Sequence, residues 1–208
     1  MKRIQILTVS LAGAAALALP TGSTGSIVGT KHDLSTYGWG SDQTCVFCHT
    51  PHNAQSSLLA PLWNHSSSTA TYNLYGEGGS SPTFNAMNTI SQPTASSKAC
   101  LSCHDGTVAM DTFGTRTGTH KMGGTSRLGT DLRDDHPISF TYDAALATAD
   151  GALAIPVSAS FVDAARKIPL FNAKMECASC HNVHDDTNTP FLRKNNGGSA
   201  LCLSCHNK

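Results

Sequence analysis

The sequence predicts a mostly irregular chain with short α-helices and little β-structure, whose interior is filled by something other than packed side chains. Aromatic residues make up 6% of the chain and apolar residues 39%, which is low for a domain that builds its core from side chains alone. Few stretches keep a regular hydrophobic period, and Gly, Ser, Thr and Asn are abundant. All eight cysteines fall in four copies of one short motif, Cys-x-x-Cys-His.

The chain begins with an apolar leader. Lys2 and Arg3 precede an apolar stretch that runs from Ile4 to Leu19 and ends in small residues. A positive start followed by a short apolar run is typical of an export signal. We expect residues 1–26 to be a signal peptide, cleaved somewhere between 18 and 26. No second apolar run of membrane length follows, so the mature protein is expected without a membrane span, in the periplasm or at the cell surface or outside it.

The four motifs carry the chemistry. Two thiols and a histidine on one short helical turn can attach a c-type haem through two thioether bonds and one iron bond. Paired cysteines also bind zinc or form redox disulfides, but neither use explains a histidine at the same offset four times. We therefore expect four covalently attached haem c groups. The attachment cysteines are Cys45, Cys48, Cys100, Cys103, Cys177, Cys180, Cys202 and Cys205, and the proximal iron ligands are His49, His104, His181 and His206.

Four haems also account for the composition. Each is a large, flat, apolar body that staples the chain to itself, so long irregular loops are tolerable around it. The motif spacing divides the mature chain, residues 27–208, into three parts: an N-terminal haem pair at 27–136, a haem-poor segment at 137–176, and a doubled Cys-x-x-Cys-His module at 177–208. A helical turn and a short hairpin are expected within 141–175.

Six further histidines can supply the second axial ligand of the irons. Methionine is the other common ligand, but the methionines beyond the leader share no recurring context. Histidine on both faces is therefore expected, which gives six-coordinate, low-spin irons of low potential. His120 lies in a Gly-rich loop without apolar neighbours and is not a candidate. The candidates, of which four are expected to bind iron, are His32, His52, His65, His136 and His184.

Two of these candidates repeat one spacing. His52 lies three residues after His49, and His184 lies three residues after His181. The two axial ligands of one iron lie on opposite faces of the porphyrin, whereas histidines three residues apart lie on the same side of a helical turn. Each second histidine is therefore expected to bind a different haem, and so to hold two haems close. The alternative for each is an exposed histidine with a local hydrogen bond.

Several stretches resemble exported multihaem c-type cytochromes of metal-reducing and related bacteria. They are KHDLS, CVFCHTPHNA, APLWNH, CLSCHDGTVA, LGTDLRDDHPISF and ECASCHNVHD followed by LCLSCH. Haem number and motif order resemble the tetrahaem members that polymerise into extracellular filaments, the cytochrome nanowires. The resemblance implies a continuous row of haems in which one histidine of each subunit binds a haem of the next. His52 best matches that role.

The expected function is electron transfer, not catalysis, because an enzyme would need an open iron position and the spare histidines outnumber the haems. The first hypothesis is self-association into a homopolymeric filament that conducts electrons from donor redox proteins to extracellular acceptors. The alternative is a soluble, monomeric tetrahaem carrier in the periplasm. The formal net charge is zero and no basic stripe appears, so no nucleic-acid partner is expected.

Overall fold

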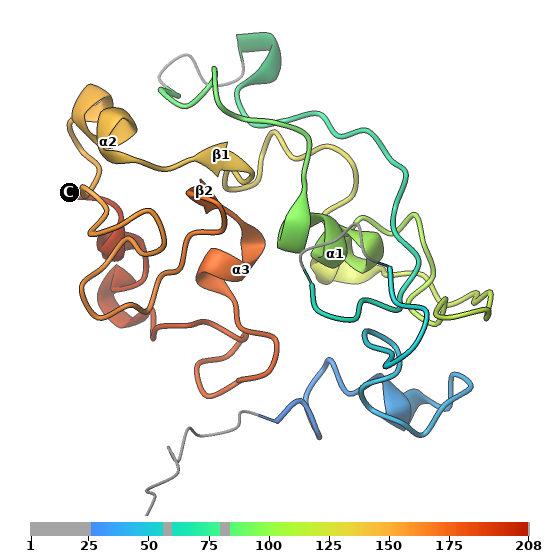
Figure 1. Cartoon of the computed structure of the whole chain (residues 1–208). Coiled ribbons are helices and arrows are strands. Elements are labelled where there is room, and N and C mark those ends of the chain that lie inside the picture. The colour runs from blue at the N-terminus through green and yellow to red at the C-terminus, as the bar shows by residue number, and fades with distance from the viewer. Residues whose placement is uncertain (1–25, 56–59, 80–83, 208) are drawn as a thin grey trace, which may run out of the picture.

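The structure, a computed structural model, describes residues 26–55, 60–79 and 84–207 (Figure 1). The expected signal peptide, apart from its last residue, lies outside the described residues. Within those three stretches, none of the helices has the length and apolar character that crossing a membrane requires.

Most of the described chain is irregular, which confirms the predicted fold class. The α-helices are α1 (Ala95–His104), α2 (Ala144–Asp150) and α3 (Cys177–Cys180). Short 3-10 helices span Leu34–Tyr37, Glu77–Gly79, Gly124–Ser126, Gly197–Ser199 and Cys202–Ser204. The two strands are β1 (Phe140–Thr141) and β2 (Lys174–Met175), which pair antiparallel with Phe140 opposite Met175.

The segment between the second and third motifs contains α2 and ends at the β1–β2 pair. Helix α2 begins where the Asp143 carboxylate accepts a hydrogen bond from the Leu146 N–H at 2.8 Å. It ends at Gly151, whose φ of 73° is a left-handed conformation that glycine adopts without a steric penalty. Pairing of β1 with β2 then returns the chain to the start of the third motif.

Two small side-chain cores hold this framework. One surrounds the β1–β2 pair and the other lies beside α1, and fully burying one large apolar side chain stabilises the fold by about 1.5–3 kcal/mol. The first core consists of Ala86, Phe140, Tyr142, Val162, Ile168, Leu170 and Met175, and the second of Tyr72, Leu74, Leu101 and Leu132. Neither core includes a motif histidine, although Leu101 of the second core lies within the second motif.

Helices α1 and α3 lie close together near the middle of the molecule (Figure 1). The backbone N–H of Cys177, the first residue of α3, donates to the Ser97 hydroxyl on α1 at 2.9 Å. Elsewhere in the fold, the N-terminal segment contacts the doubled module. The centroids of the His32 and Phe191 rings lie 4.6 Å apart. The N-terminal segment therefore lies beside the loop between the third and fourth motifs, whereas the last motif packs against residues 152–154.

Candidate functional site

Each motif forms a helical turn. In the first, third and fourth motifs the backbone N–H of the histidine donates to the carbonyl of the first cysteine, at 2.8, 3.0 and 2.9 Å. The second motif forms the last turn of α1. This turn brings two thiols and one imidazole to a single short stretch of chain, which is the local geometry that covalent haem attachment requires.

Neither a disulfide nor a cluster of metal-ligating side chains is present among the described residues. All eight cysteines are free thiols rather than disulfides. Among the described residues, no group of three or more His, Cys, Asp or Glu side chains could hold a metal ion, whereas a structural zinc site needs four such ligands.

Three motif histidines each face a second histidine from a distant part of the chain. The ring centroids of His49 and His184 are 6.0 Å apart. Those of His32 and His104 are 6.1 Å apart, and those of His136 and His206 are 6.4 Å apart. Because a metal–imidazole bond is about 2 Å long, two imidazoles on opposite sides of one metal ion have centroids roughly 6 Å apart. The spacing in all three pairs fits one iron between the rings.

The tautomer of the motif histidines also fits iron binding. A carbonyl oxygen only accepts hydrogen bonds, so a ring nitrogen that contacts one must carry the proton. When Nδ1 holds the proton, Nε2 is left with the free lone pair that a metal needs. Such Nδ1–carbonyl bonds run from His49 to Pro61 at 2.6 Å, from His104 to Ser126 at 2.8 Å, and from His181 to Pro190 at 3.0 Å. His136 makes the same bond to Pro137 at 2.9 Å.

Two buried ring nitrogens near these pairs have no partner among the described residues: His32 Nδ1 and the N–H donor Trp63 Nε1. The Trp63 ring stands edge-on to His49, with 6.5 Å between centroids. Burial, followed by the neighbouring His104, lowers the pKa of His32 to about 4, so its imidazole is neutral and able to bind a metal. A haem would place an iron beside His32, and its propionates are acceptors that such unpartnered donors can bind.

The first three attachment sites lie next to one another in space, and the neighbours are motifs that follow one another in the sequence. Burial, and then the neighbouring Cys48, raises the pKa of the Cys103 thiol. The thiols of Cys100 and Cys177 interact directly, and this contact, together with burial, raises the pKa of Cys100. The first motif is thus adjacent to the second, and the second to the third.

The third and fourth sites are adjacent as well. The pKa of Cys205 is raised to about 12, mainly by burial and then by the charge of Cys180. Because charges act on one another over short distances in a protein interior, these effects make the motifs neighbours in pairs: the first with the second, the second with the third, and the third with the fourth.

The remaining candidates behave differently. The ring of His65 is buried, and its Nδ1 and Nε2 face the carbonyls of Ser66 and Ala109 at 2.8 and 3.0 Å. His52 is exposed on a turn where its carbonyl accepts from the Thr50 hydroxyl at 2.8 Å. All ten histidines belong to the described stretches, and none of their rings stands opposite His181 as in the three pairs.

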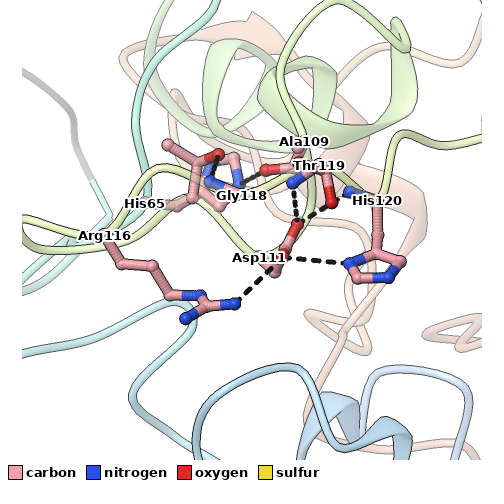
Figure 2. Close-up of polar contacts among 8 residues, drawn as sticks. His65, Ala109, Asp111, Arg116, Gly118, Thr119 and His120 are labelled. Carbon is pink, nitrogen blue, oxygen red and sulfur yellow. Dashed lines mark hydrogen bonds and ion pairs between the residues drawn. The ribbon is translucent and has the colours of Figure 1, made fainter.

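His120, which is not among the candidate ligands, is held by a buried carboxylate (Figure 2). Asp111 accepts from the backbone N–H and the ring Nδ1–H of His120 at 2.9 and 3.0 Å, and pairs with Arg116 at 3.5 Å. Burial alone would raise the pKa of Asp111, but the bonds from His120 outweigh it and hold the pKa at about 2. The His120 ring also stacks on Trp39, with 4.6 Å between centroids. No sequence pattern links these positions.

A comparison with protein families matches residues 171–208 to the family described as "Doubled CXXCH motif". This segment contains the third and fourth motifs and agrees with the expected doubled module. No curated protein matches the chain. Cys-x-x-Cys-His motifs indicate covalently bound haem c, and proteins that carry them are generally exported. The family match and the geometry of the motifs together support a multihaem c-type cytochrome, a haem-binding protein of electron transfer.

Proposed function

We propose that this chain is a tetrahaem c-type cytochrome with histidine on both faces of each iron, and that it polymerises into an extracellular filament that conducts electrons. One observation carries the proposal. Three motif histidines face a second histidine at a spacing that fits a shared iron, while His181 faces none among the described residues and His52 lies exposed.

The pairs assign the ligands within one chain. His184 serves the haem of the first motif, His32 that of the second and His136 that of the fourth. His65 is not assigned, because its ring faces no motif histidine; its Nε2 lies 3.4 Å from the Cys103 Sγ and 3.0 Å from the Ala109 carbonyl. The third haem then keeps one protein ligand, His181, and its second ligand comes from outside the chain.

In this proposal His52, an exposed histidine and the one that the resemblance implies, supplies that ligand from a neighbouring copy. It cannot reach the far face of the haem held by His49, and His184 already occupies that face in the assignment above. The donor, His52, and the acceptor site at His181 are different patches of one surface. Contacts between two different patches are head-to-tail, and they repeat along a filament unless the rotation closes into a ring.

In this mechanism the haems supply reversible iron oxidation and reduction, and the protein sets where they lie. The cysteines fix each macrocycle to its turn, and the carbonyls behind Nδ1 keep the ligand nitrogens available. Adjacent attachment sites would keep successive haems close, so that the haems, when bound, would supply a path for electrons between neighbouring motifs and across the contact between copies. Two histidines per iron leave no open position for a substrate.

The alternative is a soluble monomeric carrier in the periplasm. It is favoured by the charge, because haem propionates add negative charge to a nearly neutral chain and identical copies then repel one another. A carrier would use the same cysteines and the same three histidine pairs. The two functions differ in which group supplies the second ligand of the third haem.

Replacement of His52 by alanine tests the choice. In the filament, the holoprotein forms polymers visible by electron microscopy and its haems are all low-spin by electron paramagnetic resonance. His52→Ala should abolish the polymers and leave one high-spin haem per chain. His120→Ala, which also changes an exposed histidine, should behave as the unaltered protein does. A His52→Ala protein with only low-spin haems, or an unaltered protein that stays monomeric, would refute the filament.

A further inference from the structure

Glu176, immediately before the third motif, is a buried carboxyl group whose two oxygens differ. Its side chain is 1% exposed. Oε2 accepts hydrogen bonds from the hydroxyls of Ser97 and of Ser139, the latter at 2.9 Å. Oε1 is buried and has no partner among the described residues. A buried carboxylate oxygen without a partner costs free energy, and most of that cost disappears when the carboxylate is protonated to the neutral acid.

The charges around Glu176 do not offset its burial. Lys174 on β2 is the cation that acts on it, but the Lys174 ammonium bonds the Ser91 hydroxyl at 3.0 Å. The other titratable group that it influences is the thiol of Cys177 on α3, which no longer titrates once haem is attached as a thioether. Burial is the largest influence, and it raises the pKa of Glu176 despite the two serine bonds and Lys174.

The carboxyl lies between two attachment sites. Ser97, which donates to Glu176, also accepts the N–H of Cys177 at 2.9 Å. The thiols of Cys100 and Cys177 interact directly beside it. An electron that reaches either site adds negative charge to a low-dielectric interior, where charges interact strongly. Negative charge next to a carboxyl group favours its protonated form.

We propose that Glu176 is a proton-binding site coupled to the passage of electrons through the second and third haems. As one electron arrives and ferric iron becomes ferrous, the Glu176 carboxylate binds one proton from solvent and becomes a carboxylic acid. When the electron moves on and the iron returns to ferric, the acid releases that proton. The charge of the interior then changes little as electrons pass.

This proposal rests on covalent haem at the second and third motifs and not on polymerisation, because the site lies within one chain. A haem count on the purified protein checks that prerequisite separately. Loss of filaments, as in His52→Ala, would leave the present proposal standing.

The test is a redox titration of the holoprotein over a series of pH values. The potentials of two haems should fall as pH rises across the range in which Glu176 titrates, because protons favour the reduced state. Glu176→Gln keeps a hydrogen-bond acceptor for the serines but cannot titrate, so the same potentials should become independent of pH in that range. Asp111→Asn is the control. It removes a buried aspartate carboxyl elsewhere in the fold, so the haem potentials should keep their pH dependence.

Infrared difference spectra between the oxidised and reduced unaltered protein give a second readout. Reduction should produce the carbonyl band of a protonated carboxylic acid, shifted in heavy water and absent from Glu176→Gln. If the Gln variant does not mature, Ser139→Ala removes one donor to Oε2 and should move the pH-dependent range upward. Potentials of Glu176→Gln that still follow pH, absence of the acid band, or an unmoved range in Ser139→Ala would each overturn the proposal.

Discussion

His49 and His184 lie with their ring centroids 6.0 Å apart and their planes 22° from parallel, although they come from the first motif and from the doubled module near the end of the chain. His184 therefore faces the first motif and not its neighbour His181. An iron bound by both rings would cross-link distant parts of the chain. A bond that closes a long loop reduces the conformational freedom of the unfolded chain and so stabilises the folded one.

His184→Ala should leave the haem of the first motif with one protein ligand. We expect one high-spin haem per chain by electron paramagnetic resonance, in monomers and in any polymer alike. We also expect a lower temperature for thermal unfolding, because the link between the two ends of the chain is lost. His120→Ala is the control, since its ring is held by Asp111 and faces no motif histidine. A fully low-spin His184→Ala protein would show that the 6.0 Å pair does not share an iron.

Ser97→Ala should weaken the packing of α1 against α3. The change removes a hydroxyl that both accepts the Cys177 N–H and donates to Glu176. Unsatisfied buried polar groups cost about 1–3 kcal/mol each, so the free energy of unfolding should fall by at least that amount. Chemical denaturation of the holoprotein measures the loss.

Ser96→Ala is a matched control one residue away on the same helix. The Ser96 hydroxyl is buried without a hydrogen-bond partner among the described residues, so its removal should leave stability unchanged or slightly higher. Equal losses in Ser96→Ala and Ser97→Ala would show that the tie between the helices is not what stabilises this region.

Gly118→Ala should disturb the loop that holds His120. A Cβ at Gly118 would lie 2.1 Å from Asp111 Oδ1 and 2.6 Å from the Asp111 backbone carbon, so the loop must move (Figure 2). Overpacking of this kind costs about 1–3 kcal/mol, and denaturation should show that loss. Gly123→Ala places its Cβ in open space with φ at −139° and should cost little, which makes it the control. Similar stabilities for the two variants would contradict the described packing around Asp111.

Asp111 should make stability depend on pH in the acid range. Its pKa in the folded protein is about 2, below the ordinary 3.8, so the ionised form stabilises the fold. The contribution is fully present above the unfolded pKa and is lost as pH falls from about 4 to about 2. Lowering the pKa from 3.8 to about 2 corresponds to about 2.5 kcal/mol. Denaturation of the unaltered protein and of Asp111→Asn over this range should converge at the acid end, and parallel curves would argue against an ionised Asp111.

The sequence by itself determined the local chemistry. The Cys-x-x-Cys-His spacing is short, so one helical turn fixes the relative positions of the thiols and the histidine whatever the rest of the chain does. The low aromatic content and the absence of hydrophobic periodicity predicted the irregular fold, and the structure confirms it. The sequence also gives five histidines as candidate second ligands, because few other residue types bind haem iron, and which of them bind stays a prediction.

Only the tertiary structure decided which distant residues meet. His184 faces His49, His32 faces His104 and His136 faces His206 across long irregular segments, for which no periodic pattern gives a register. The surroundings of Glu176 and Asp111 likewise come from residues far apart in the chain. Covalent spacing fixes contacts within a turn, whereas contacts between turns depend on how loops close and pack, and sequence spacing does not encode that.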